Sequence, residues 1–371
     1  MAISAIGVIF SNMHEENVPE LVRRRTMASI PYGGRYRIID FALSNMVNSG
    51  ITTVGLMTSN NYRSLIDHIG SGKDWDLARK NGGFVLLPPF GDKDSDILYS
   101  TRMEALKSIL GFINRCTEEY VVMSDSNSVF NIDFNLMLKN HKDTGADVSL
   151  LYAKKDMKDI SGTNNVIFTM EDEQIKKISV DPKISGEINI YANVCIIKKD
   201  LLVSLVADAI AHGRRHFIKD LIATNLNALK VVGYEHKGFF EEISSLKRFY
   251  DVSLMLLDSD VRKSLFSDAQ VYTKIKDSAP TEYGANAVIT NSLVSDGCQI
   301  EGEVHNSILA RGVKVGRGAV VRNCVLMKNT IVGDNSSINA VITDKNVVIR
   351  DRLVLSGCSD LPFYIKKDVS I

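Results

Sequence analysis

Short apolar runs alternate with segments of helical spacing over roughly the first two thirds of the chain. The apolar runs predict buried strands at Ile3–Phe10, Thr53–Thr58, Tyr120–Ser124, Asp147–Ala153, Val194–Ile197 and Lys230–Tyr234. Apolar residues spaced three or four apart predict helices between them, including Tyr62–Ile69, Arg102–Asn114 and Phe134–Lys142. This alternation is typical of a parallel sheet covered on both faces. Ligands bind beyond the carboxyl ends of such strands, so the residues after Phe10, Thr58 and Met123 are the ones to inspect.

Residues 31–58 form a strong local pattern within this part. The Gly33-Gly34 pair predicts a tight turn, because glycine tolerates positive φ. A buried helix face follows at Ile38, Ile39, Leu43, Met46 and Val47. Gly50 then stops the predicted helix, and a strand begins at once.

The pattern changes after Tyr234. Residues Ser245–Phe266 predict one long helix, and from about Val288 the sequence becomes repetitive and rich in β-branched residues. A six-residue step relates Val313, Ala319, Val325, Ile331 and Ser337, and after an offset of four it resumes at Val341 and Val347. Such a step is typical of a left-handed parallel β-helix. We therefore predict an α/β domain over 1–240, a connecting helix and linker over 241–285, and a β-helix domain over 286–371.

Composition and charge exclude several classes of protein. The chain has 371 residues with 44 basic and 44 acidic side chains, so it lacks the basic excess that binding to nucleic acid or anionic membranes requires. Five scattered cysteines without a CxxC pair predict a reduced, cytoplasmic protein. No apolar run approaches the roughly 20 residues of a membrane helix.

The sequence resembles the glucose-1-phosphate adenylyltransferase family. The resemblance is carried by Pro31–Gly50, by Asp67–Leu77, by Leu87–Phe90 and by the C-terminal repeats, and it covers most of the chain. It implies a Rossmann-like nucleotidyltransferase domain of the GT-A-like type, followed by the left-handed β-helix. Within the family the sequence is most similar to the GlgD-type subunit, a catalytically degenerate paralogue, because the groups that hold the triphosphate are missing.

The missing groups are those that neutralise charge during adenylyl transfer. The loop after the first strand, Ser11–Asn17, has no glycine, and Asn12, Met13 and Glu15 stand where the family has glycines. Met27 and Asp181 stand at two family lysine positions, so we expect no functional catalytic set. The adenine-side element is reduced to Tyr99–Met103. Phosphoryl transfer depends on positioning and on charge neutralisation, which these changes remove.

Two carboxylates survive at family metal positions. Asp125 matches one metal aspartate and Glu242 stands near the second. One hypothesis is a residual Mg²⁺ site, since Mg²⁺ favours a few carboxylates with water. The alternative is that Asp125 is a strand-end turn residue and Glu242 a solvated side chain. We expect that the protein requires no cofactor, except Mg²⁺ if the residual metal site is present.

An arginine cluster suggests a different ligand. In the family, positions matching Arg24, Arg25 and Arg37 contribute to an anionic effector site between the domains, and Arg35 lies beside them in the sequence. Arginine suits phosphate through its bidentate guanidinium. The alternative is a solvated basic face with one buried ion pair, such as Arg37 with Asp40.

The resemblance implies a non-catalytic or weakly catalytic regulatory subunit of glucose-1-phosphate adenylyltransferase in glycogen synthesis. Its expected partner is a catalytic subunit, in a hetero-oligomer such as a tetramer, or a second copy of itself. Two enzyme alternatives stay open: an active adenylyltransferase that uses Asp125 and Glu242, and a hexapeptide-repeat acyltransferase, for which His305 is the available base. A scaffold that binds no small molecule is the remaining alternative.

Overall fold

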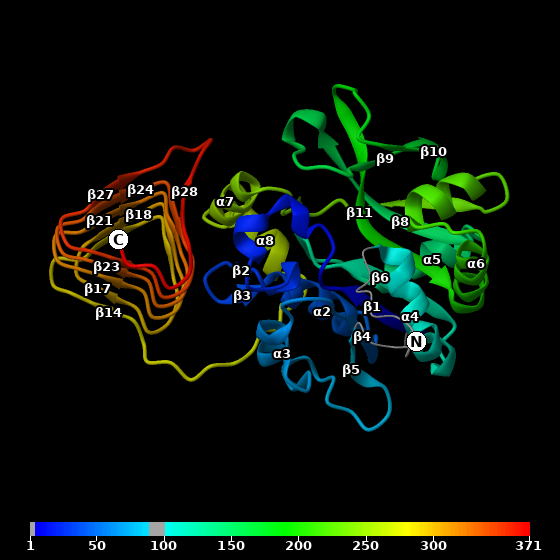
Figure 1. Cartoon of the computed structure of the whole chain (residues 1–371), viewed down its shortest axis with the longest axis horizontal. Helices are drawn as coiled ribbons and strands as arrows, with labels where there is room; N and C mark the ends of the chain where they lie inside the picture. Colours follow the sequence, from blue (N-terminus) through cyan, green and yellow to red (C-terminus); the bar gives the residue numbers. More distant parts are fainter. Residues whose placement is uncertain (1–3, 89–100) are drawn as a thin grey trace.

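The computed structural model describes residues 4–88 and 101–371. Figure 1 shows two parts: an α/β domain, and a coiled domain of short strands that is viewed nearly along its axis. Within the described residues, none of the helices combines the length and apolar composition that a membrane crossing requires. The expected order of an α/β nucleotidyltransferase-like domain followed by a parallel β-helix is therefore confirmed in the arrangement of the elements.

A nine-stranded sheet forms the centre of the α/β domain. Its spatial order is β5 (Gly83–Leu87), β4 (Thr53–Met57), β1 (Ala5–Phe10), β6 (Tyr120–Asp125), β11 (Glu187–Lys198), β8 (Val148–Asp156), β12 (Val231–Glu235), β10 (Gln174–Val180) and β9 (Val166–Glu171). The strands β5, β4, β1 and β6 are parallel, and so are β8 and β12. The expectation of an all-parallel sheet is wrong, because β11 pairs antiparallel with both β6 and β8. The chain runs from β8 through β9 and β10 into β11 by short connections. Parallel neighbours need a long crossover, so these short connections favour antiparallel pairing.

Helices cover both faces of this sheet. The helices are α1 (Pro19–Val22), α2 (Ile38–Asn48), α3 (Arg63–Ile69), α4 (Arg102–Arg115), α5 (Phe134–Asp143), α6 (Lys199–Ala211), α7 (Leu246–Met255) and α8 (Ser259–Phe266). Apolar residues of α2, α3 and α5 share one core with the sheet, whereas those of α4 and α6 share another. Two small sheets pair β2 (Pro31–Tyr32) with β3 (Tyr36–Arg37), and β7 (Ser128–Phe130) with β13 (Phe240–Glu242).

The C-terminal domain consists of three parallel five-stranded sheets. The first stacks β14 (Glu282–Tyr283), β17 (Gln299–Ile300), β20 (Lys314–Val315), β23 (Ile331–Val332) and β26 (Val348–Ile349). The second stacks β15 (Val288–Thr290), β18 (Glu303–His305), β21 (Val320–Arg322), β24 (Ser337–Asn339) and β27 (Val354–Ser356). The third stacks β16 (Leu293–Val294), β19 (Ile308–Leu309), β22 (Val325–Leu326), β25 (Val341–Thr343) and β28 (Phe363–Ile365). Each coil buries apolar side chains against the next, as stacked repeats require.

The six-residue step identifies the β-helix, but it does not mark an inward-facing residue at every position. Val313 and Ala319 point inward with 0% exposure, but Ile331 is 39% exposed. In the later coils strand pairs relate residues 17 apart, for example Lys314 with Ile331 and Ile331 with Val348, whereas some earlier pairs, such as Val288 with Glu303, are 15 apart. A later coil is therefore one residue shorter than three hexapeptides, and the inward position moves from residue 331 to Thr330, which is fully buried.

Helices α7 and α8 lie between the two domains (Figure 1). They are not the single long helix that the sequence predicted, because the Asp258 carboxylate accepts the backbone N–H groups of Asp260 and Val261 and caps a new helix. A continuous apolar cluster joins both domains through these helices, and its members include Leu21, Tyr32, Phe41, Phe249, Val252, Ile308, Val325 and Ile342. The domains are therefore packed against each other through a hydrophobic core.

Candidate functional site

The loop 11–17 lies at the carboxyl ends of β1, β4 and β6, where the sequence placed the site. The backbone N–H of Ser59, which follows β4, donates to Asn12 Oδ1 at 2.8 Å. His14 Nε2 lies 3.0 Å from Asp125 Oδ2 at the end of β6. The loop also borders a cavity of ≈ 370 Å³, whose wall includes Arg102 and Lys219. The three strand ends thus meet around one cleft.

The loop is held in place by its own Glu15. The Glu15 Oε1 atom accepts the Asn12 amide at 2.7 Å and the backbone N–H of Met27 at 3.1 Å. The Met27 side chain is fully buried in the apolar core, so this family lysine position presents no cation to the cleft. A carboxylate of the chain therefore occupies the backbone donor of Met27.

Glu15 makes the stability of the protein depend on pH. Burial raises the pKa of Glu15 from 4.5 to about 7, although its two hydrogen bonds oppose the shift. A raised carboxyl pKa means that the folded state disfavours the ionised form, so stability falls as pH rises from about 4.5 through 7. The full shift corresponds to roughly 3 kcal/mol, which we reduce to about 2 kcal/mol because the side chain is partly exposed.

We expect Glu15→Gln to raise the free energy of unfolding by about 2 kcal/mol at pH 8 and to leave it unchanged near pH 4.5. The glutamine keeps an oxygen that can accept both hydrogen bonds but carries no charge. Urea unfolding of both proteins at several pH values measures the difference. A stabilisation of equal size at pH 4.5 and pH 8 would contradict the prediction.

Asp125 and Glu242 lie in one buried neighbourhood. Asp125 Oδ2 accepts from His14 and forms an ion pair with Arg102, and its side chain has no exposed surface. Glu242 Oε1 accepts the Asn127 amide at 2.5 Å. Burial raises the pKa of Glu242, and the nearby Asp125 charge adds to the shift. Burial alone would lower the pKa values of His14 and Arg102, but the Asp125 carboxylate raises both above their ordinary values.

These carboxylates do not fit a metal site as they stand. No group of three or more His, Cys, Asp or Glu side chains in residues 4–88 and 101–371 is arranged to hold a metal ion. The partners of Asp125 are a guanidinium, which cannot ligate a cation, and an imidazole. The alternative hypothesis is right that Asp125 stands at a strand end, since it is the last residue of β6, but its side chain is buried in an ion pair with Arg102. Glu242 is half-buried, and its carboxylate accepts the Asn127 amide.

Asp181 stabilises a backbone turn and does not present its charge to the cleft. Its carboxylate accepts the backbone N–H groups of Asn164 at 2.7 Å and Asn165 at 2.8 Å, and its own φ is 44°. It therefore closes a surface turn beside β10. Of the reduced adenine-side element, Tyr99 and Ser100 lie outside the described residues, while Thr101 caps α4 through the backbone N–H of Glu104.

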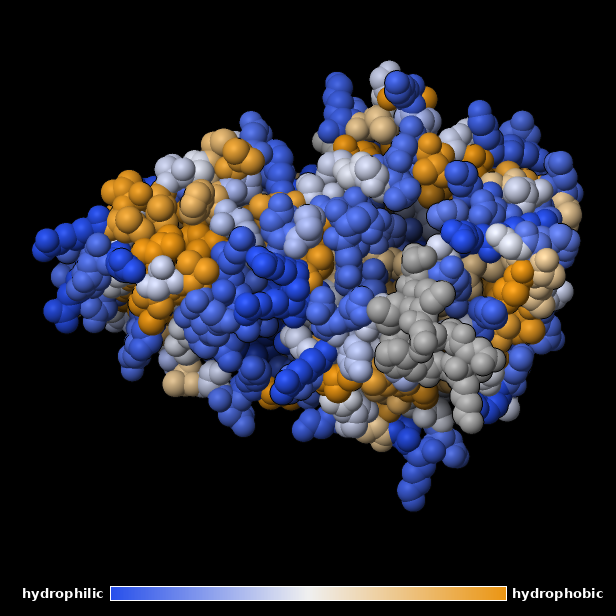
Figure 2. Space-filling view, in the orientation of Figure 1, coloured by the Kyte–Doolittle hydropathy of each residue, from blue (hydrophilic) through white to orange (hydrophobic). Residues whose placement is uncertain are grey.

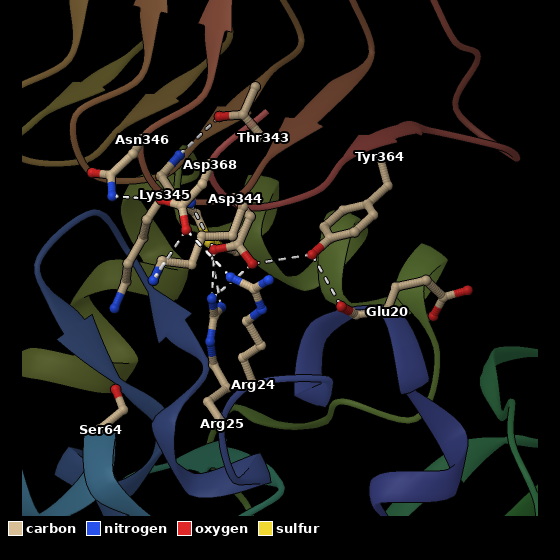
Figure 3. Close-up of polar contacts among 12 residues, drawn as sticks. Glu20, Arg24, Arg25, Ser64, Thr343, Asp344, Lys345, Asn346, Tyr364 and Asp368 are labelled. Carbon is tan, nitrogen blue, oxygen red and sulfur yellow. Dashed lines mark hydrogen bonds and ion pairs between the residues drawn. The ribbon is translucent and has the colours of Figure 1, made fainter. Parts of the chain in front are cut away.

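The four arginines that were expected together lie in four different environments. Figure 3 shows Arg25 reaching the β-helix, where its Nη2 donates to both Asp344 oxygens at 2.5 and 2.7 Å. Arg24 pairs with Asp368 at 3.3 Å on the surface. The Arg37 guanidinium donates to Ser64 and forms no ion pair with Asp40, although the backbone N–H of Arg37 donates to Asp40 Oδ2 at 3.0 Å. Arg35 lies apart and stacks over the Tyr36 ring.

Buried cations nevertheless gather where the two domains meet. Burial lowers the pKa of Lys345 to about 7, and the charges of Arg37 and Arg25 add to the shift. Burial also lowers the pKa of Arg37 to about 10. A cavity of ≈ 190 Å³ adjoins this region, and its cationic wall is formed by Arg23, Arg24, Lys366 and Lys367. The excess of positive charge makes an anion the favoured ligand here.

Sequence reasoning missed the partners that complete these clusters. Asp344 and Tyr364 come from the last coils of the β-helix, and the Tyr364 hydroxyl donates to Asp344 Oδ2 at 3.1 Å. From the sequence, His14 was only part of the loop 11–17, and Arg102 was only part of the reduced adenine-side element. The sequence carries no local signal for a pairing such as Arg25 with Asp344, which lie 319 positions apart. His305, the candidate acyltransferase base, contacts Thr290 and Glu303 on one β-helix sheet.

Comparison with known proteins identifies similar chains for each domain. Residues 19–258 match the nucleotidyl transferase family model, and residues 276–358 match the model of the GlmU-like C-terminal hexapeptide. The glycogen biosynthesis protein GlgD of Bacillus subtilis (strain 168) is 33% identical over 98% of this chain and 95% of its own length. GlgD of Geobacillus stearothermophilus is 34% identical over 85% of this chain and 82% of its own length. The glucose-1-phosphate adenylyltransferase of Clostridium perfringens (strain 13 / Type A) is 30% identical over 95% and 96%.

Proposed function

The chain belongs to the nucleotidyl transferase family that includes GlgD and glucose-1-phosphate adenylyltransferase, and from this premise we propose that it is a regulatory subunit of glucose-1-phosphate adenylyltransferase in glycogen biosynthesis. It works in the cytoplasm and has little or no catalytic activity of its own. It joins a catalytic subunit in a hetero-oligomer, adjusts the activity of that subunit and binds an anionic effector between its two domains.

The observation that carries this proposal is the loop 11–17. In it, Glu15 takes the backbone donor of Met27, and the Met27 side chain is buried instead of presenting a cation. The rest of the fold is complete, with a continuous apolar core that joins both domains. A preserved scaffold beside a phosphate site that lacks the two family lysines, at Met27 and Asp181, supports a role in assembly and regulation.

The surface of the β-helix supports a protein partner. Figure 2 shows apolar residues gathered on the β-helix side of the molecule. The exposed large hydrophobic side chains of this domain are Tyr283, Val288, Ile331, Val354, Leu361 and Phe363. Val354 and Leu361 are 73% and 76% exposed, which is unfavourable for a surface that faces only water. Tyr283 and Ile331 lie on the first sheet, Val288 and Val354 on the second and Phe363 on the third, and we propose that the catalytic subunit covers part of these exposed side chains.

The test measures ADP-glucose formation from ATP and glucose 1-phosphate. This chain alone is expected to turn over below about 10⁻² s⁻¹, against about 1–10³ s⁻¹ for ordinary enzymes. Mixed with a catalytic subunit of the family, it is expected to coelute on size exclusion and to change kcat or the effector response. Turnover in the ordinary range by this chain alone, or no complex and no kinetic change, would refute the proposal.

The effector part of the proposal has its own probe and control. Fructose 1,6-bisphosphate and AMP are expected to raise the thermal midpoint of this chain if the cationic region between the domains binds phosphate. Lys345→Ala should remove that shift. Arg214→Ala is a matched control, because it removes a basic residue far along the chain that pairs only with Asp208 among the described residues. Equal responses in both variants would exclude this site.

A further inference from the structure

Arg102 is built into the cleft as a fixed cation. It is the first residue of α4, whose start is fixed by a capping box between Thr101 and Glu104. Its side chain is only 11% exposed, forms an ion pair with Asp125 Oδ2 and lies 5.2 Å over the Phe10 ring. A guanidinium held by a helix start, an aromatic face and a buried carboxylate has little freedom to leave.

Asp125 Oδ2 already has a charged partner within the chain. The two acids of the neighbourhood, Asp125 and Glu242, face two basic groups, Arg102 and His14. A divalent cation at Asp125 would be attracted by the carboxylates but repelled by the guanidinium that contacts the same oxygen. The other oxygen, Asp125 Oδ1, is buried without a hydrogen-bond partner in the described part of the chain. That oxygen is the ligand a metal ion would reach if the charge of Arg102 were removed.

We propose that Arg102 is a resident counter-ion that takes the place of the divalent cation at Asp125. The pair also has a mechanical consequence. The Arg102–Asp125 pair connects the start of α4 to the end of β6, and the His14 contact connects Asp125 to the loop 11–17. The loop 11–17, the end of β6 and the start of α4 are thus joined by the chain's own charged groups. This property concerns the isolated chain and goes beyond its role as a subunit.

The inference is tested by titrating Mn²⁺ alone into the purified full chain and counting bound ions by electron paramagnetic resonance. The wild-type protein is expected to bind no Mn²⁺ at this site. Arg102→Gln keeps hydrogen-bond donors near Asp125 but removes the charge, and is expected to bind one Mn²⁺ at least tenfold more tightly than the wild type. The bound ion should also raise the thermal midpoint of this variant.

Two further variants control the result. Arg102→Lys keeps the charge and should gain no Mn²⁺ binding. Adding Asp125→Asn to Arg102→Gln should abolish the gained binding, which separates this site from other acidic groups on the surface. If Arg102→Gln does not fold, Arg102→Ala produced with Mn²⁺ takes its place, and recovery of folded protein only with the metal supports the inference.

A stoichiometric Mn²⁺ site in the wild type that Asp125→Asn removes would overturn the inference. So would folded Arg102→Gln and Arg102→Ala proteins that bind no more Mn²⁺ than the wild type. The result is independent of the subunit proposal, because neither catalytic partner nor substrate is present. A failed pairing experiment with a positive Mn²⁺ result would leave this inference intact.

Discussion

Replacing Arg25 with alanine is expected to lower the free energy of unfolding by about 3–5 kcal/mol, because the change leaves the Asp344 carboxylate buried without its partner. The side chains of Arg25 and Asp344 are only 4% and 5% exposed, and two hydrogen bonds join them. The pair also connects the N-terminal part of the α/β domain to the β-helix. Urea unfolding followed by circular dichroism measures the change.

The adjacent Arg24 provides the matched control. It also pairs with a β-helix carboxylate, Asp368, but the two side chains are 66% and 45% exposed. Water screens such a pair, so Arg24→Ala should change stability by less than about 1 kcal/mol. In the double variant Arg25→Ala with Asp344→Asn, most of the loss should be recovered, because no buried charge remains unpaired. Similar losses for Arg24→Ala and Arg25→Ala would contradict the prediction.

The contrast between these two arginines shows where sequence reasoning ends. The run Arg23-Arg24-Arg25 is visible in the sequence, and Arg24 and Arg25 were expected to act together on an anion. Burial and partners instead separate Arg25, which is fixed by Asp344, from Arg24, which remains near the surface. Which arginine is buried depends on how the β-helix packs against the α/β domain, and local spacing contains no information on that packing.

Prediction of the fold was more successful, because periodicity reports local structure directly. The strands β1, β4, β6, β8 and β12 and the helices α3, α4 and α5 lie where apolar spacing predicted them, within a few residues. The direction of β11 was not predicted, since an apolar run has the same pattern in either orientation. In the β-helix the apolar repeat identified the architecture, but it did not reveal that strand pairs are 15 residues apart in some coils and 17 in others.

Prediction from the sequence reaches the same limit for the residues of the candidate cleft. The absence of glycines and lysines could be read from residues 11–17, Met27 and Asp181. What replaced them could not be read, because it depends on contacts between distant elements. Arg102 reaches Asp125 from the start of another helix, and Glu15 turns back to the Met27 amide. A lost site can therefore be recognised from sequence, whereas the interactions that fill it require the structure.

Gly302→Ala should be among the most damaging single changes in the β-helix, with an expected loss of about 3 kcal/mol. A Cβ at Gly302 would lie 2.3 Å from the carbonyl oxygen of Ala319 and 2.7 Å from that of Gly316, in the next coil. These are backbone atoms and cannot rotate away. The Ala319 oxygen also accepts the backbone N–H of Glu303 at 2.8 Å, so moving it would break the ladder that joins the two coils.

The control is a glycine with open space around it. A Cβ at Gly111 in α4 would meet no atom within 4 Å, and alanine is the better helix former by about 0.5–1 kcal/mol. Gly111→Ala is therefore expected to stabilise the protein, although it makes the same chemical change as Gly302→Ala. Denaturant unfolding of the two variants beside the wild type gives both values. Equal effects, or a stable Gly302→Ala protein, would mean that the coils are not packed as closely as the fold requires.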